Sequence, residues 1–138
     1  MKHACLSLAA ISSLLVAMSV QAHASCTSDT VIQMSGEHDV PWSIAVDIHP
    51  DTVLLNQPFD ATIHICSKSG DLPDQLKVDA TMPAHNHGMN YNPKMSRLAD
   101  RQYKVENLLF HMPGIWELEV TTLDNGVPHR FTHDLKIQ

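Results

Sequence analysis

Short segments in which apolar and polar residues alternate one by one dominate this chain from residue 42 onward. Such alternation indicates a β-strand with one buried face, whereas an amphipathic helix repeats its apolar residues about every 3.6 positions. Pro, Gly and Asn separate the segments and mark turns between strands. The alternating segments are residues 42–49, 59–66, 76–82, 103–110, 116–121 and 127–137. No helical pattern of useful length competes with them, so the chain is predicted to be all-β.

Two irregularities refine this prediction. The alternation slips by one position near Glu106 and Asn107, which predicts a β-bulge. The sequence Asp124-Asn125-Gly126 predicts a tight hairpin turn. Six or seven short strands within about 100 residues predict an immunoglobulin-like antiparallel β-sandwich of about seven strands.

The first two dozen residues have the profile of a secretory signal peptide. A short basic head precedes an uncharged stretch, residues 4–20, rich in Ala, Leu and Ser. That stretch is at the lower limit of what can cross a bilayer, so an uncleaved membrane anchor is the less favoured alternative. We predict a signal peptide over residues 1–24. Cleavage after Ala22 and lipid attachment at Cys26 are further alternatives.

Export would leave an acidic domain with two cysteines. The predicted domain, residues 25–138, keeps every acidic residue but loses Lys2, so its formal charge is -6 minus 1, or -7. Phosphate backbones attract basic surfaces, so nucleic acid is not an expected partner. An oxidising compartment favours a disulfide between Cys26 and Cys66. The alternative is a Cys66 thiolate that binds a metal ion together with His64.

The segment between residues 82 and 95 is rich in metal-binding side chains. It reads Met82-Pro83-Ala84-His85-Asn86-His87-Gly88-Met89 and is followed by Met95. Imidazole suits Cu(II), Zn(II) and Ni(II), whereas thioether selects Cu(I), so the mixture indicates copper. In an extended chain, His85 and His87 would lie about 6.6 Å apart on one side, close enough to bind one ion. The predicted metal ligands are His85, His87, Met89 and Met95, with His111 as an additional member.

His111 is included in this set because of the expected directions of the strands. Antiparallel strands alternate in direction, so the loops at one end of a sandwich come together. If residues 95–99 form a strand, the strands ending at Met82 and Phe110 finish at the same end. His111 would then lie near the 83–95 loop, whereas a loop at 95–99 would break the cluster.

Several of these residues have an alternative role. Met82 and Met112 follow the inward phase of their strands, which predicts that they are core residues. The imidazoles of His85 and His87 could instead hydrogen-bond the backbone of a polar turn, and the loop methionines could cover a protein contact. His129 lies on the apolar face of its strand, so we expect a partly buried, hydrogen-bonded side chain.

Two blocks of this sequence resemble the YtkA-like domain family. One is the 82–89 segment, and Tyr103 lies between it and the second block. The second block is Phe110-His111-Met112-Pro113-Gly114-Ile115-Trp116-Glu117-Leu118. The resemblance covers roughly residues 42–123 and extends to FixH-related proteins and, broadly, to CopC-type periplasmic copper-binding sandwiches. It implies an exported or membrane-anchored immunoglobulin-like β-sandwich. Glycine is common between the two histidines in this family, whereas this chain has Asn86.

The likeness to CopC-type proteins also implies a second possible copper site. Cleavage after Ala22 would make His23 the mature N-terminus. Its amine and imidazole could then chelate Cu(II) with another histidine, as in histidine-brace sites.

These observations predict a periplasmic or secreted metal-binding protein, with a copper ion as cofactor, that acts as a carrier or buffer. The alternative is a metal-free interaction or assembly module of the FixH/YtkA-like type that uses the 83–95 loop or a sheet edge. The expected partners are a metal ion and a periplasmic or membrane protein. An enzyme is not expected, because the sequence has no nucleophile elbow, phosphate loop, zinc-hydrolase helix or paired carboxylate site.

Overall fold

The computed structural model describes most of the predicted domain. The described residues are 26, 31–36, 39–90 and 92–138. The predicted signal peptide, both candidate cleavage positions and His23 lie outside these residues. Within the described part of the chain, no helix is long and apolar enough to cross a membrane.

Strands make up nearly all the regular structure of the described residues. Seven strands have six or more residues: β3 (Trp42–His49), β4 (Phe59–Ser67), β5 (Gln75–Met82), β7 (Lys94–Ala99), β8 (Gln102–Leu108), β9 (Gly114–Asp124) and β10 (Val127–Ile137). Three have two residues: β1 (Ile32–Gln33), β2 (Ser35–Gly36) and β6 (His87–Gly88). The 3-10 turn η1 (Pro83–His85) precedes β6. The predicted all-β class is confirmed.

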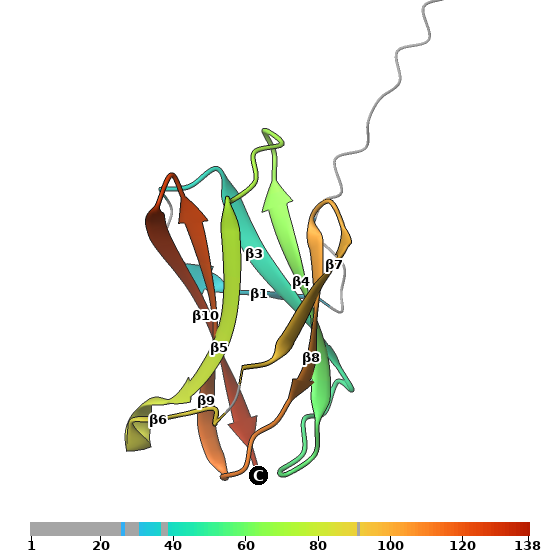
Figure 1. Cartoon of the computed structure of the whole chain (residues 1–138). Helices are drawn as coiled ribbons and strands as arrows, with labels where there is room; N and C mark the ends of the chain where they lie inside the picture. Colours follow the sequence, from blue (N-terminus) through green and yellow to red (C-terminus); the bar gives the residue numbers. More distant parts are fainter. Residues whose placement is uncertain (1–25, 27–30, 37–38, 91) are drawn as a thin grey trace, which may run out of the picture.

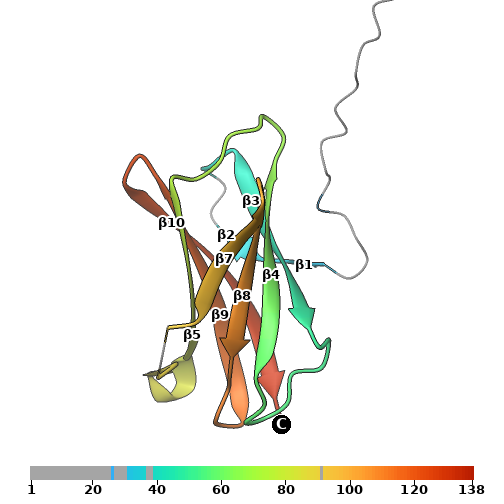
Figure 2. The ribbon, with the colours of Figure 1, turned by 45° about the vertical axis from the view of Figure 1, so that its right-hand side comes forward.

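Two antiparallel sheets of five strands face each other (Figures 1 and 2). One has the order β1-β3-β4-β8-β7 and the other β2-β10-β9-β5-β6. If the seven long strands are lettered A to G in chain order, the sheets contain A-B-E-D and G-F-C. Constant-type immunoglobulin domains have this strand order. The predicted antiparallel β-sandwich is therefore confirmed.

The alternation in the sequence determines which side chains fill the space between the sheets. Along β4, each odd-numbered residue from Phe59 is buried and each residue between is partly exposed. The rings of Phe110 and Trp116 stack with centroids 4.7 Å apart, and Phe59 lies 5.1 Å from Phe110. These aromatic residues fill one end of the core.

Both predicted irregularities occur where expected. The register between β4 and β8 shifts opposite Asp60, so the predicted bulge is confirmed. Within it, Asn107 has a φ of 63°, and its N–H donates to the Asp60 carboxylate at 3.0 Å. Asn125 and Gly126 form the two-residue turn between β9 and β10 with φ of 49° and 81°. Positive φ at both positions is typical of a type I′ hairpin, as the sequence predicts.

The direction of β7 brings the metal-binding loops to one end of the sandwich. Residues 94–99 do form a strand, which satisfies the condition for this cluster. The strands β5 and β8 consequently both finish at the lower end in Figure 1. There η1 and β6 follow β5, and the loop that carries His111 joins β8 to β9.

Candidate metal centre

Two of the five predicted ligands meet at this end of the sandwich. His87 begins β6, and His111 lies in the loop between β8 and β9. Their Nε2 atoms are 2.6 Å apart, and their ring centroids are 4.8 Å apart with the planes nearly perpendicular. At this distance one ring donates its N–H and the other accepts with its lone pair. Both side chains are half-buried, so the pair remains accessible from solvent.

Trp116 forms an aromatic wall beside the histidine pair. Its ring centroid lies 6.1 Å from that of His87 and 5.6 Å from that of His111, edge-on to both. The indole is fully buried, and its N–H donates to the main-chain carbonyl of Met112 at 2.9 Å. This hydrogen bond fixes the loop that carries His111, because it joins that loop to a core side chain.

A tight turn after β5 places His87 against the core. Pro83 begins η1, where its fixed φ suits the first turn and its missing N–H costs nothing. Asn86 ends the turn in the left-handed region, with a φ of 47°, and its N–H donates to the carbonyl of Pro83 at 3.3 Å. Asn adopts this conformation more readily than other residues with a side chain. Asn86 therefore suits this left-handed position at the end of the turn.

The histidine pair offers two nitrogen donors to a metal ion. A tetrahedral ion with metal–nitrogen bonds of about 2.0–2.1 Å holds its nitrogens about 3.4 Å apart. The rings would therefore separate by about 0.8 Å when an ion replaces the shared hydrogen. Among the described residues, no group of three or more His, Cys, Asp or Glu side chains could hold an ion. A thioether from a neighbouring methionine would complete such a site and would favour a soft ion.

The other predicted ligands lie in different surroundings. His85 is exposed on η1, and Met89 is half-buried against the core. Met95 lies on β7 and is 38% exposed. It lines a pocket of about 300 Å³ with Leu76, Lys77, Val78, Asn92 and Pro93. Val78 lies about 13 Å along β5 from Met82, the residue that pairs with His87. The structure thus brings His87 and His111 together and places Met95 further up the sandwich.

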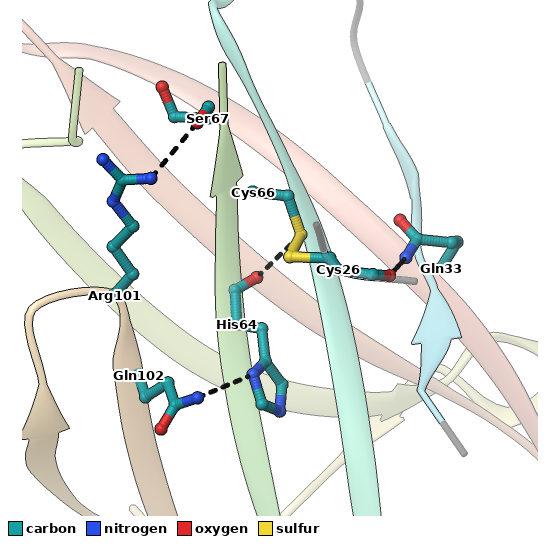
Figure 3. Close-up of a disulfide and its surroundings, with 7 residues drawn as sticks. All are labelled: Cys26, Gln33, His64, Cys66, Ser67, Arg101 and Gln102. Atoms are coloured by element: carbon teal, nitrogen blue, oxygen red, sulfur yellow. Dashed lines mark hydrogen bonds between the residues drawn. A yellow bond between two sulfur atoms is a disulfide. The ribbon is translucent and has the colours of Figure 1, made fainter. Parts of the chain in front are cut away.

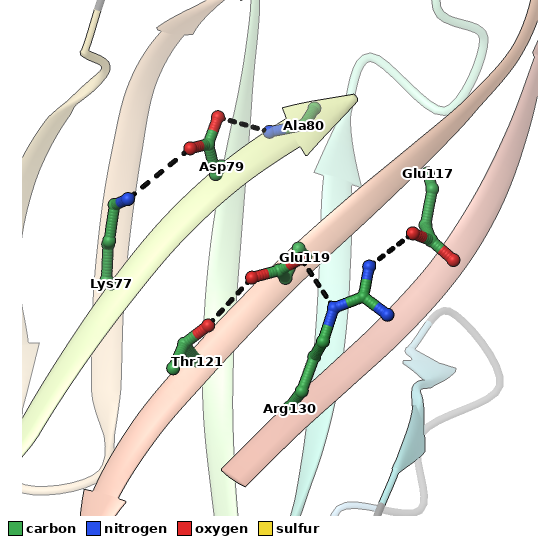
Figure 4. A network of polar contacts seen from close by, with 7 residues as sticks. All are labelled: Lys77, Asp79, Ala80, Glu117, Glu119, Thr121 and Arg130. Atoms are coloured by element: carbon green, nitrogen blue, oxygen red, sulfur yellow. Dashed lines mark hydrogen bonds and ion pairs between the residues drawn. The ribbon is translucent and has the colours of Figure 1, made fainter. Parts of the chain in front are cut away.

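A second pocket, of about 360 Å³, opens beside His87. Glu117 and Arg130 contribute to its lining, together with residues of the η1 turn. Arg130 donates through its guanidinium to Glu117 and to Glu119, the latter at 2.6 Å (Figure 4). Burial raises the pKa of Glu119, but hydrogen bonds from Arg130 and Thr121 outweigh it and lower that pKa below its usual value. The Glu119 carboxylate therefore keeps its negative charge to a lower pH than usual, paired with the Arg130 guanidinium.

The alternative site at Cys66 is not formed, because its sulfur is bonded to that of Cys26 (Figure 3). The Cα atoms of this pair are 5.7 Å apart, and the predicted disulfide is confirmed. The carbonyl of Cys26 accepts a hydrogen bond from the Gln33 side chain on β1 at 2.7 Å. A disulfide is compatible with an oxidising compartment.

His64 lies next to this disulfide, and its lowered pKa should make the stability of the fold depend on pH. Burial lowers the pKa of His64 below its usual value, against an opposing effect of Asp47. The unfolded chain binds a proton at this residue near pH 6.5, whereas the folded chain does not until the pH is lower. Stability is therefore lost as the pH falls below about 6.5. We expect His64→Gln to lose less stability between pH 7.5 and 5.5 than the wild type, as measured by urea unfolding.

The matched control for this prediction is His85→Gln, because His85 is exposed. It should show the same pH dependence as the wild type. Equal pH dependence in His64→Gln and the wild type would contradict the prediction.

Trp116, Glu117 and Arg130 take part in this site although sequence reasoning did not assign them to it. The first two belong to residues 110–118, one of the two blocks that resemble the YtkA-like family. That block is therefore the part of the sequence that could have pointed to them. Comparison with protein-family models, curated proteins and solved structures finds no match to this chain. Membership of the YtkA-like family therefore stays a prediction.

Proposed function

We propose that this protein is an exported carrier or buffer for copper and binds the ion between His87 and His111. The observation that supports this most is the 2.6 Å separation of their Nε2 atoms. Residues 24 positions apart in the chain present ring nitrogens to each other at a half-exposed site. Two imidazoles beside methionine side chains favour copper over zinc, because thioether is a poor ligand for the harder ion.

Exposure of the site suits a carrier rather than a structural metal centre. A buried, closed site retains its ion, whereas a half-exposed pair can pass an ion to a partner by ligand exchange. His85 and Met89, on either side of His87, are the additional ligands proposed from the loop sequence. The disulfide and the resemblance to YtkA-like proteins both agree with export.

Anaerobic Cu(I) titration against a chromogenic chelator tests this function. We expect the wild type to bind one Cu(I) ion tightly. His87→Ala/His111→Ala should bind at least about 100-fold more weakly, because loss of even an outer-shell partner costs a metal site 10- to 100-fold.

The matched control is His49→Ala/His133→Ala, which removes two imidazoles from strands β3 and β10. The His49 side chain is 55% exposed, so its loss should leave the fold intact. This control should bind Cu(I) like the wild type. Weak binding by the wild type, or equal affinity in both double variants, would overturn the proposal.

A second candidate function, a metal-free interaction module, is supported by the edge strand β7. All six of its residues are exposed, and Leu98 is 56% exposed. An exposed edge offers unpaired backbone groups to which a partner strand can pair. This function would be favoured if Leu98→Lys abolished biological activity while His87→Ala/His111→Ala preserved it.

A further inference from the structure

Met82 lies between His87 and Trp116 on the inner face of the second sheet. Strand β5 pairs with β6 so that Met82 is directly opposite His87. On its other side, β5 pairs with β9, and Thr81 lies opposite Glu117. Because the two strands are antiparallel, the next residue of β5, Met82, is level with the preceding residue of β9, Trp116. Residues directly opposite each other point to the same side of a sheet, with Cβ atoms about 4.5–5.5 Å apart. The three side chains therefore form one row across the sheet.

The thioether of Met82 reaches the loop that carries His111. A Cβ added to Gly114 would lie 2.8 Å from the terminal methyl of Met82 and 3.8 Å from its sulfur. Gly114 has a φ of 136°, which residues with a side chain rarely adopt, so glycine leaves this space open. Met82 also contributes to the pocket beside His87. Its side chain thus extends from the strand opposite His87 to the end of the His111 loop.

We propose that the Met82 thioether is the third ligand of the copper ion and makes this site select Cu(I) over Zn(II). This inference rests on the proposed function. Met82 is 1% exposed and lies beside Trp116, whose ring stacks on that of Phe110. Two neutral imidazoles and a neutral thioether leave a bound Cu(I) with one positive charge and a bound Zn(II) with two. Because burial penalises charge, the apolar surroundings add to the preference of sulfur for Cu(I).

The experiment compares Met82→Leu with the wild type in the full chain. Leucine replaces methionine at similar volume, a change that protein cores tolerate well, so the variant should fold. We expect its Cu(I) affinity to fall at least about 10-fold, while its Zn(II) affinity changes much less. The copper X-ray absorption spectrum of the wild type should contain a sulfur contribution that Met82→Leu loses.

Two variants serve as controls. Met34→Leu makes the same substitution at another buried methionine, so it shows the effect of replacing a core thioether away from the histidine pair. Met89→Leu removes the half-buried thioether two residues after His87. Met34→Leu should keep both the sulfur contribution and the Cu(I) affinity of the wild type. Met89→Leu should keep the sulfur contribution, because Met82 supplies it.

The outcomes separate this inference from the proposed function. If the wild type does not bind Cu(I), the proposed function fails. If it binds through His87 and His111 but shows only nitrogen ligands, the inference fails while the function stands. Loss of the sulfur contribution in Met89→Leu instead of Met82→Leu would also overturn it. A wild-type spectrum without a sulfur contribution would overturn the inference by itself, so the test does not depend on the stability of Met82→Leu.

Discussion

Replacing Trp116 with alanine is expected to lower the free energy of unfolding by about 3–5 kcal/mol. The indole is fully buried and stacks on Phe110 at 4.7 Å, so its removal leaves a large cavity in the core. The carbonyl of Met112 also loses its hydrogen-bond donor, which frees the loop before β9. Because that loop carries His111, Cu(I) affinity should fall as well. Urea unfolding measures the first effect and chelator competition the second.

Trp42→Ala is the matched control, because it makes the same substitution at the opposite end of the core. Trp42 begins β3 and is 5% exposed, and its indole N–H donates to Thr122. We expect a comparable loss of stability but unchanged Cu(I) affinity under conditions where the variant is folded. A loss below about 1 kcal/mol in Trp116→Ala would contradict the packing argument. Equal weakening of copper binding in both variants would contradict the role of Trp116 at the site.

Removing the disulfide with Cys26→Ser/Cys66→Ser is expected to lower the free energy of unfolding by about 4 kcal/mol. The two cysteines are 40 residues apart, and the bond restricts the unfolded chain by closing a loop of that length. Urea unfolding of the oxidised wild type, the reduced wild type and the variant measures the effect. The reduced wild type and the variant should have similar midpoints.

The disulfide should matter little for the metal site itself. Ser67, next to Cys66, pairs with Trp42, whereas Asp60 at the other end of β4 pairs with His49. Cys66 is therefore at the end of the sandwich opposite the histidine pair. We expect unchanged Cu(I) affinity in the folded variant, and an unchanged unfolding midpoint after reduction would contradict the stability prediction.

Local chemistry explains why much of the fold could be predicted from the sequence. The alternation along β4 shows which side chains are buried, because successive residues of a strand point to opposite faces. The Asn125-Gly126 hairpin turn follows from residues that tolerate positive φ. The bulge at Asn107 appears as a slip in the alternation. Each of these features depends on a few neighbouring residues.

The ligand set could be predicted only in part, because strand pairing joins residues that are distant in the chain. The sequence by itself determined the all-β sandwich and a His/Met-rich segment after β5. Only the tertiary structure decided that His87, rather than His85, meets His111, and that Met95 lines a separate pocket. Alternation assigns Met82 to the core but does not identify its neighbours. The pairing of β5 with both β6 and β9 places it beside His87 and Trp116, because register determines which side chains meet across a sheet.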